Sequence, residues 1–500
     1  MLAEMGLLVE PIRYLSQDEM EAIHQAALRI LDEIGVWIDS EEALNYLSNT
    51  GCIVNYDTRI VRFPADLVQG MVDRMRQAYA EPNPVPERMA VRYSQIYFST
   101  KPHQVHSDFT TNTGGFCVHI YDLEGNRRPA TMQDVRDSIR LADALDNIDF
   151  MGLPVSAQEV PPPVRPVVMA AELVKMTRKL GGVETFDRLD VHFISRIAEI
   201  AAGSPQALRR NPILVGYAEA RTPLCIDQNM AEILVEYAKM GLPQSLDTMP
   251  NGGATAPITS AGVLALGIAE SLAGLVLCYA VDPNAVVSID VCPSLADMRS
   301  GLYTYASPER MPLLAANSQM MSEYYGCPGG THGGKTDACY PGVQAGMEKV
   351  MSMLFPLLAG STGIGTVGHL ENAVTFSPQQ LVIDNEIAGS VRRMLQGFVV
   401  SEDTLAVEVI QEVGHGGNFL AHDHTLRHLR SEIHGSKMLP RVNWGAASQE
   451  SHRSLEERAK DVARQLMQKE SCRPLTLDRE QAIDEVVDEA WVKRRELGQV

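Results

Sequence analysis

The chain has 500 residues, 45% of them hydrophobic, and its 43 basic and 63 acidic residues give a formal net charge of −20. This hydrophobic content excludes a disordered chain, because disordered chains bury too little apolar surface to offset the entropy of ordering. The acidic excess excludes the positive field with which a nucleic-acid binder neutralises phosphates. We therefore expect a soluble, folded protein that binds no nucleic acid.

Cysteine spacing and apolar patterning indicate a cytoplasmic protein. The eight cysteines include no CxxC pair, so neither a zinc ribbon nor a disulfide framework is indicated. The N-terminus has no basic segment ahead of a long apolar run and does not resemble a signal peptide. The most apolar stretch, residues 258–281, contains Glu270 and three glycines. We expect it to pack as a helix against a sheet rather than to enter a membrane.

Residues 1–135 are predicted to form an α+β segment. A helix is expected over residues 16–34, because Ser16 and Glu19 have capping-box spacing and apolar residues recur at helical intervals behind them. A second, short helix is expected over residues 39–49. Strands are expected from their apolar and β-branched residues, the last two forming a hairpin. These strands cover residues 53–54, 60–63, 89–98, 115–121 and 127–130.

From residue 136 to about 420, helical runs alternate with short apolar runs. Seven or eight such alternations predict an α/β protein with a (β/α)₈ barrel, and a doubly wound sheet is the alternative. Residues 421–500 are charged and amphipathic, and they predict a C-terminal helical tail. The strand-like runs cover residues 150–155, 182–185, 213–217, 244–248, 286–290, 326–337, 363–369 and 404–413.

In such a barrel, the residues that follow the strands build the site. No acid/base pair stands out among them, so we assign no catalytic acid or base. Scarce aromatic residues near strand ends and in the hairpin region are candidates for binding a cation. The substrate-pocket candidates are Asn251, Phe186, Tyr217, Glu219, Thr331, His332 and Tyr97. Further candidates for the mouth of the barrel are Gly333, Gly334, His369 and Glu371.

Two glycine-rich segments resemble nucleotide-binding motifs only superficially. Residues 363–368 have the spacing GxGxxG, but a helical run precedes them and no helix start follows. We interpret this segment as a barrel strand of small residues that leaves space for a ligand. Residues 329–334, followed by Lys335, lack the strand and helix context of a phosphate-binding loop. We interpret them as a loop through which the backbone approaches a ligand closely.

Three histidines form the densest histidine cluster of the sequence: His422, His424 and His428. If the segment is helical, His424 and His428 lie one turn apart on one face, as zinc ligands would. No partner that would orient these rings is evident, and surface histidines are the favoured interpretation. No metal site is predicted, and a zinc enzyme built on this cluster remains an alternative.

Several motifs, in order along most of the chain, resemble the trimethylamine methyltransferase family. The first is residues 251–259, with sequence NGGATAPIT, followed by the segments at 264–266 and 270–275. The second group comprises Thr336-Asp337 and the QAG at 344–346. The third comprises the DNE at 384–386 and the VGHGGNFL at 413–420.

The resemblance implies a TIM-barrel methyltransferase that depends on a corrinoid. The cobalamin-type corrinoid would be carried by a separate, small partner protein, and this chain would hold no tightly bound cofactor. Family members that act on trimethylamine contain pyrrolysine, whereas this sequence contains only the twenty standard residues. The resemblance therefore implies a quaternary amine substrate, with glycine betaine as the first choice, and a homo-oligomeric, cytoplasmic protein. The candidates at the barrel mouth would face the corrinoid.

The chemistry agrees with the absence of an acid/base pair. A quaternary ammonium leaves as a neutral tertiary amine when its methyl group is displaced, so no general acid is required. The protein has to align the substrate, exclude water and hold a cation. Two alternatives stay open: a zinc-dependent methyl transferase or hydrolase that uses His422, His424 and His428, and a non-catalytic binder of quaternary amines.

Overall fold

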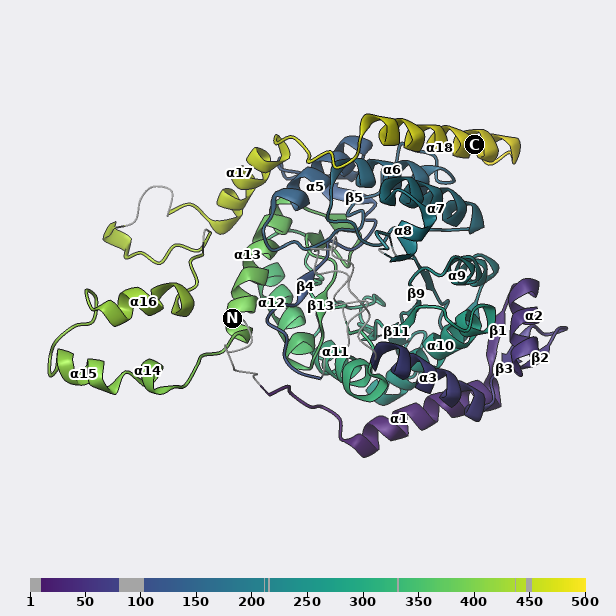
Figure 1. The fold of residues 1–500 in the computed structure, drawn as a ribbon, viewed down its shortest axis with the longest axis horizontal. Coiled ribbons are helices and arrows are strands. Elements are labelled where there is room, and N and C mark those ends of the chain that lie inside the picture. The colour runs from purple at the N-terminus through teal and green to yellow at the C-terminus, as the bar shows by residue number, and fades with distance from the viewer. Residues whose placement is uncertain are drawn as a thin grey trace.

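The computed structural model describes residues 10–80, 103–210, 212–214, 216–330, 332–436, 438–446 and 452–500. It is a mixed α/β structure in which short strands lie at the centre and helices surround them (Figure 1). The strand expected over residues 89–98 lies outside the described residues.

The N-terminal elements form a small sheet that is joined to the middle of the chain. The capping box of Ser16 and Glu19 starts helix α1, as predicted. The sheet has the order β2-β3-β1-β8, and its last strand comes from residues far along the chain. Helix α3, which directly follows the expected strand at residues 60–63, was not predicted. The elements are α1 (Gln17–Arg29), η1 (Ile30–Ile34), β1 (Val36–Ile38), α2 (Glu41–Thr50), β2 (Ile53–Asn55), β3 (Ile60–Arg62), α3 (Ala65–Ala80) and β8 (Cys225–Ile226).

The predicted hairpin is present, and it pairs with a distant segment. Strand β5 (His119–Tyr121) is antiparallel to β6 (Arg127–Pro129) and parallel to β15 (Thr375–Phe376). β15 in turn pairs with β14 (His369–Leu370). Upstream, β4 (Thr110–Thr111) runs parallel to β13 (Gly363–Ile364). The residues before and after the central region therefore meet in space.

The central strands pair in parallel. β7 (Gly216–Glu219), β9 (Gln244–Thr248) and β11 (Val287–Val291) form a sheet of order β11-β9-β7, and β10 (Asn251–Gly252) pairs with β12 (Ser294–Leu295). Isolated parallel bridges join Asn112 to Phe150 and Met151 to Leu180. The expected strands at 182–185 and 326–337 are not assigned as strands among the described residues. The surrounding helices are α5 (Met132–Ala144), α6 (Arg165–Met176), α7 (Arg188–Ala202), α8 (Pro205–Arg210), α9 (Gln228–Met240), α10 (Ser260–Val281), α11 (Arg310–Gln319), η2 (Met320–Tyr325), α12 (Val343–Leu358) and α13 (Pro378–Leu395).

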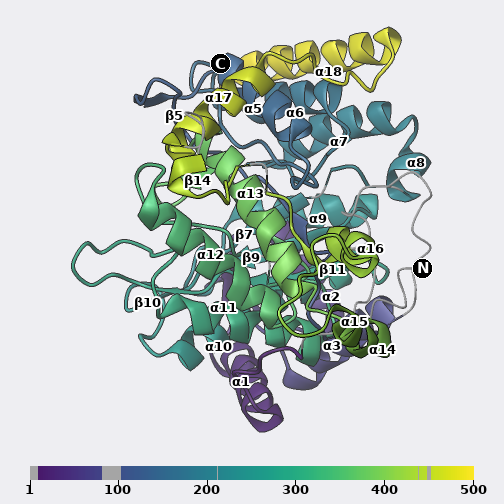
Figure 2. The ribbon, with the colours of Figure 1, turned by 90° about the vertical axis from the view of Figure 1, so that its left-hand side faces the viewer.

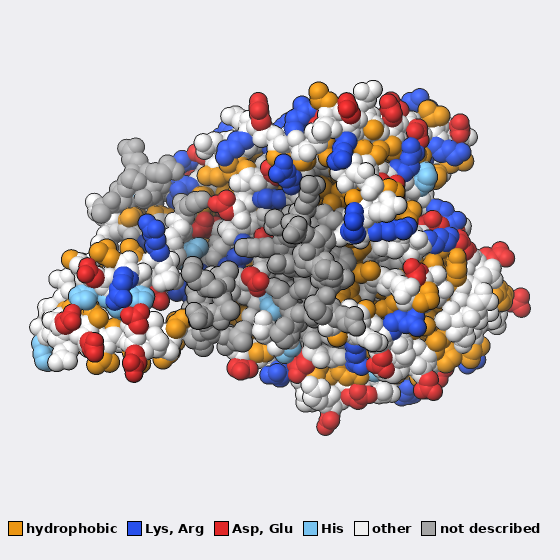
Figure 3. All heavy atoms as spheres, in the orientation of Figure 1, with side chains coloured by type: hydrophobic (Ala, Val, Ile, Leu, Met, Phe, Trp, Pro, Cys, Tyr) orange, Lys and Arg blue, Asp and Glu red, His pale blue; other side chains and the backbone are white. Residues whose placement is uncertain are grey.

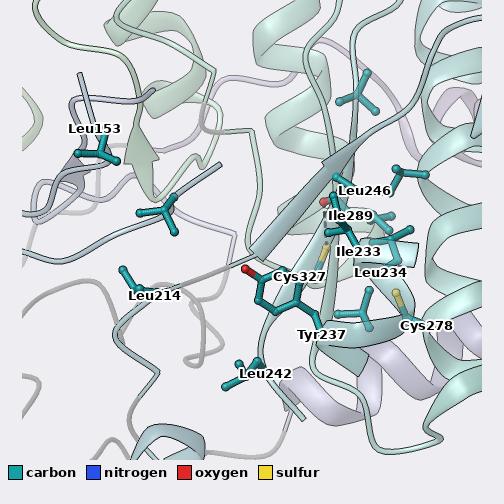
Figure 4. Packing of buried hydrophobic residues seen from close by; sticks show 14 of the residues in the cluster. Leu153, Leu214, Ile233, Leu234, Tyr237, Leu242, Leu246, Cys278, Ile289 and Cys327 are labelled. Atoms are coloured by element: carbon teal, nitrogen blue, oxygen red, sulfur yellow. Dashed lines mark hydrogen bonds between the residues drawn. The ribbon is translucent and has the colours of Figure 1, made fainter. Parts of the chain in front are cut away.

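Helix α10 is the most apolar helix and lies in the core. It has the length and hydropathy of a membrane span, but 89% of its apolar window is buried inside the protein. Leu246 and Ile289 of the adjacent strands belong to the same packed core as Cys278 of this helix (Figure 4). A Cβ on Gly274 would come within 2.4 Å of Leu246, so glycine permits this close approach of helix and strand. The helix therefore packs against a sheet, as predicted.

After α13 the chain forms an arm of three short helices that projects from the body (Figure 1). The arm comprises α14 (Glu402–Leu405), α15 (Val407–Val413) and α16 (Asp423–Glu432), none of which contains a buried residue. The strand-like interpretation of residues 404–413 was wrong. Its apolar residues pack against neither a sheet nor a core. The segment forms helices, and Ser401 caps the first of them, α14.

The C-terminal segment returns to the body as helices α17 (Leu455–Met467) and α18 (Leu477–Glu496), which lie along one edge (Figure 2), after the short turn η3 (Trp444–Ala446). The buried Arg494 anchors α18 to the start of α7. Its guanidinium donates to Asp187 at 2.6 Å and 2.8 Å and to Asp190 at 2.8 Å. The charged tail is therefore attached through a buried ionic contact.

Candidate active site

A cavity of about 430 Å³ lies at the centre of the structure, and most of its lining residues lie at or just after the ends of the parallel strands. The wall combines glycines with ionisable side chains. Its residues are Asn112, Gly114, Gly115, Phe116, Phe150, Gly152, Gly182, Glu184, Gly216, Glu219, Ser245, Asp247, Met249, Cys292, Tyr305, His332, Lys335, Gly365, Thr366, Asn372 and Ala373.

Strand register places a row of three carboxylates across the central sheet. Glu219 of β7 is opposite Asp247 of β9, and Asp247 is opposite Asp290 of β11. Neighbouring strands lie about 4.8 Å apart, so these acids are near neighbours. Glu219 and Asp247 line the cavity directly, and Glu184 adds a further carboxylate to its wall. One side of the cavity therefore has an excess of negative charge.

Burial and mutual repulsion perturb these acids. Burial raises the pKa of Asp247 to about 6, with the charge of His332 opposing the rise and those of Asp290 and Glu219 adding to it. Glu219 remains in contact with cavity solvent, yet the surrounding walls desolvate it enough to raise its pKa. Ser245 Oγ donates to Asp247 Oδ1 at 2.8 Å and fixes that carboxylate.

His332 and Lys335 bring positive charge to the same cavity. His332 Nε2 lies 3.3 Å from Asp290 Oδ2. Burial alone would lower the pKa of His332, but the neighbouring Cys292 and Asp290 raise it to about 10. Lys335 is 7% exposed, and burial lowers its pKa. Its ammonium lies 4.3 Å from the centre of the Tyr305 ring, a cation–π contact.

Arg310 and Asp337 position the residues behind this cationic side. Arg310 is fully buried and donates to the carbonyl oxygens of Pro293 at 2.9 Å and Tyr305 at 2.7 Å. Asp337 accepts from the backbone N–H of Tyr305 at 2.7 Å. These contacts hold the Tyr305 ring at the cavity wall.

The cavity edge carries strained backbone. Among the described residues, nine non-glycine residues have positive φ, and four of them line the cavity: Phe116, Thr366, Asn372 and Ala373. Such conformations cost about 1–3 kcal/mol each and persist where the surrounding structure imposes them, commonly at functional sites. Asn372 Nδ2 also donates to the Tyr303 carbonyl at 2.9 Å. The strain identifies this edge as part of a constrained site.

Of the predicted pocket residues, His332 and Glu219 line the cavity together. Phe186 does not line it but is 52% exposed at an adjoining depression that shares Phe116 and Glu184 with the cavity. Asn251 is buried away from the cavity, where its carbonyl accepts three backbone N–H groups of a tight turn. The Asn251 prediction placed a turn-forming residue in the pocket, because asparagine after a strand serves both purposes. Tyr217 lies on β7, where only its backbone is described, and Tyr97 and Thr331 lie outside the described residues.

The four predicted mouth residues also do not line the cavity. His369 is 1% exposed and packs edge-on against Phe376, and burial holds its pKa well below the usual range. Glu371 pairs with Arg127 at 2.7 Å. A Cβ on Gly333 would lie 2.3 Å from the Ser352 carbonyl oxygen, and one on Gly334 would lie 2.5 Å from Ile364. These two glycines permit close packing of segments behind the wall.

The histidine cluster lies on the projecting arm, where histidine and acidic side chains are visible at the surface (Figure 3). The ligand atoms of Asp403, His424 and His428 lie within 4.8 Å of one another. His428 Nε2 is 3.1 Å from Asp403 Oδ2. His422 does not join them, because its Nδ1 accepts from the His424 backbone N–H and caps α16. None of these residues belongs to the cavity wall.

Asp247, Cys292, Lys335 and Tyr305 were not among the predicted pocket residues, although Cys292, Lys335 and Tyr305 lie near the ends of predicted strands. Asp247 lies within β9 rather than after it, and only the strand register reveals its alignment with Glu219. Lys335 was considered both as a residue at a predicted strand end and as part of a superficial phosphate-loop pattern, but it was not chosen as a pocket residue. Tyr305 lies in a long connection after β12 and is one of several aromatic residues near strand ends, and nothing local distinguishes it from the others.

The chain is similar to known proteins over almost its whole length. A model of the trimethylamine methyltransferase (MTTB) family matches residues 5–498. Trimethylamine methyltransferase MttB of Methanosarcina barkeri is 29% identical over 484 residues, which cover 96% of this chain and 95% of that protein. Glycine betaine methyltransferase of Desulfitobacterium hafniense strain Y51 is 29% identical over 435 residues, which cover 86% of this chain and 87% of that protein.

Among solved structures, the Methanosarcina barkeri monomethylamine methyltransferase (MtmB) aligns with a TM-score of 0.43 at 13% identity, over 92% of this chain and 95% of that one. The family model, rather than this structural alignment, is decisive, because it extends over almost every residue. The chain belongs to the trimethylamine methyltransferase (MTTB) family.

Proposed function

We propose that this protein transfers a methyl group from a zwitterionic quaternary amine, such as glycine betaine, to the Co(I) corrinoid of a separate small protein. The observation that carries the proposal is a cavity whose wall contains both the carboxylates of Glu219 and Asp247 and the basic side chains of His332 and Lys335. A betaine carries both charges on one small molecule, whereas trimethylamine carries no carboxylate. Relatives named for both kinds of substrate support the family-level chemistry equally.

The carboxylate row would bind the ammonium end. A quaternary ammonium cannot donate N–H hydrogen bonds, so negative field and aromatic faces must hold it. Glu219 and Asp247 supply the field, and Tyr305 and Phe116 supply rings in the same wall. Lys335 and His332 would hold the substrate carboxylate through charge-assisted hydrogen bonds. Together these contacts fix the direction of the N–CH₃ bond.

The corrinoid supplies the cobalt nucleophile when the partner protein is bound. A cavity of about 430 Å³ is at the small end of ligand pockets, which span roughly 300–1,000 Å³, and a corrin macrocycle with its side chains does not fit within it. The geometry therefore supports a corrinoid presented at the mouth by another protein. This chain's own contribution is to bind, orient and desolvate the amine.

We also propose that the central region is a closed TIM barrel. Parallel pairs link β13 to β4, residue 112 to 150 and 151 to 180, and β7 to β9 to β11. This order follows the chain around a ring, as a barrel requires. It would begin at β4, ahead of the predicted boundary at residue 136, and end at α13.

The unpaired state of all eight cysteines supports a location in the reducing cytoplasm. Homo-oligomerisation is proposed from membership of the family alone.

The test is to mix the purified protein with Co(I) cobalamin and a panel of amines, and to follow the methylcobalamin spectrum. Glycine betaine should act as a methyl donor, whereas tetramethylammonium and trimethylamine should be poorer donors or inactive. No methylcobalamin from any amine, also with the corrinoid protein present, would contradict the proposal. Calorimetric binding of betaine without methyl transfer would instead support the non-catalytic binder. Stoichiometric zinc that is lost in a His424→Ala, His428→Ala variant, together with lost activity, would support the zinc alternative.

A further inference from the structure

Cys292 stands in a different environment from the other cysteines. It follows β11 directly and lines the cavity. Its Sγ accepts from Arg310 Nη2 at 3.4 Å and lies 4.0 Å from Lys335 Nζ, while the Tyr303 hydroxyl donates to the Cys292 carbonyl oxygen at 2.5 Å. Sulfur is a weak hydrogen-bond acceptor as a neutral thiol, so these donors are better matched by a thiolate.

The cations around Cys292 come from separate parts of the chain. Arg310 lies on α11, while His332 and Lys335 lie in the glycine-rich loop before α12. Acidic groups face the same space from the neighbouring strands, namely Glu219, Asp247 and Asp290, and Asp290 is already engaged by His332 at 3.3 Å. Two of the cations contact the sulfur, Arg310 at 3.4 Å and Lys335 at 4.0 Å.

Lys335 provides an independent observation. The residue is 7% exposed, and among the described residues its ammonium contacts Cys292 Sγ at 4.0 Å and the Tyr305 ring at 4.3 Å, with no oxygen acceptor. A buried ammonium with no oxygen partner is costly unless an anion lies nearby. A thiolate at Cys292 supplies that anion.

The contrast with the other cysteines is consistent. Burial raises the pKa of Cys52 and of Cys327 to about 12, and it also raises those of Cys117 and Cys278. Burial opposes ionisation of Cys292 too, but His332, Lys335 and Arg310 outweigh it and lower its pKa well below the usual value. Equal burial with opposite outcomes identifies the cations as the cause.

We propose that Cys292 is a thiolate at the cavity wall and a covalent modification site for small, soft electrophiles, namely thiosulfonates and hydroperoxides. With methyl methanethiosulfonate, the thiolate attacks the sulfenyl sulfur, an S–S bond forms, and methanesulfinate leaves with the electron pair of the broken S–S bond. With hydrogen peroxide, the thiolate attacks one oxygen, the O–O bond breaks, hydroxide leaves, and Cys292 is oxidised to a sulfenic acid. Each product fills cavity space and removes the negative charge that neutralises Lys335 and Arg310.

The wild-type chain contains its own comparator, because Cys339 is exposed. The experiment treats the native protein with limiting methyl methanethiosulfonate at pH 6 and pH 8 and quantifies both modified peptides by mass spectrometry. An ordinary thiol with a pKa near 8.5 loses about 75-fold in thiolate fraction, and so in rate, between pH 8 and pH 6. Cys292 should lose less than about threefold. In urea, both cysteines should show the ordinary pH dependence.

Two further samples make the result specific. A Cys292→Ser variant should lose the pH-independent modification, and a Lys335→Met variant should restore part of the pH dependence. If Cys292 in the native protein is unmodified at both pH values, or slows as steeply as an ordinary thiol, the inference is wrong. This readout requires no amine substrate, so it is separate from the proposed function. Protection by glycine betaine would test only the placement of the substrate.

Discussion

Replacing Lys335 with methionine tests the proposed orientation of the substrate most directly. Methionine retains much of the side-chain volume but removes the ammonium that lines the cavity. A hydrogen bond to a charged partner is worth about 1.5–3 kcal/mol, which corresponds to roughly a 13- to 160-fold change in affinity. We therefore expect the Kd of glycine betaine to rise by about that factor. Tetramethylammonium has no carboxylate, so its Kd should change by less than about threefold.

Isothermal titration calorimetry of both ligands provides the measurement. The control is Lys239→Met on α9, because that lysine pairs with Glu42 and Glu236 at the surface, away from the cavity. This control should bind both ligands as the wild type does. The reasoning is refuted if Lys335→Met weakens the two ligands equally, or if its effect on glycine betaine is no greater than that of the control.

Three other outcomes are expected. The pKa of Asp247 is raised to about 6, so its negative charge is lost as the pH falls through that value; ammonium affinity should decline below about pH 6, and Asp247→Asn should flatten that decline in pH-dependent calorimetry. Asp384 pairs with the fully buried Lys349 at 2.6 Å. Asp384→Asn should lower the free energy of unfolding by about 3–5 kcal/mol in urea titration, because the Lys349 charge would stay buried without its partner. A loss below about 1 kcal/mol would show that other groups compensate that charge. Gly152→Ala should destabilise the protein by about 1–3 kcal/mol, because the added Cβ would lie 2.8 Å from the Gly114 carbonyl oxygen. Gly346 faces open space on α12, so Gly346→Ala should instead stabilise the protein by up to about 1 kcal/mol. Equal effects of the two variants on the melting temperature would contradict the packing argument.

Local signals predicted local structure well. The capping residues of α1, the hairpin around residues 122–126 and the buried helix α10 all follow from neighbouring residues. The run at 404–413 misled because alternating apolar residues indicate a strand only where a sheet is available to bury one face. In this chain that run forms helices on an arm without a core.

Only some of the cavity-lining residues could be predicted from the sequence, because the others are brought to the cavity by contacts between distant segments. Glu219 follows the strand-like run at 213–217, and His332 lies in the glycine-rich run at 326–337, so position alone suggested them. The pairing of Glu219 with Asp247 depends on register between strands, and the approach of Tyr305 and Lys335 depends on loops closing over the cavity. Asn251 and His369 have suitable chemistry and sequence positions but do not line this cavity: the Asn251 carbonyl accepts in a tight turn, and the His369 ring packs against Phe376.

The glycines in the cavity wall restrict how this enzyme can be re-engineered. A Cβ on Gly216 would lie 2.3 Å from the Tyr237 ring, and one on Gly114 would lie 2.3 Å from Thr366. Side chains added at these positions would collide with the supporting wall before they altered the ligand space. A library aimed at new amine donors should therefore leave the glycines unchanged and vary the polar residues Glu184, Glu219 and Asp247 and the ring of Tyr305. The backbone at these glycines has to stay as it is, so substrate selectivity is best changed through the side chains that line the cavity.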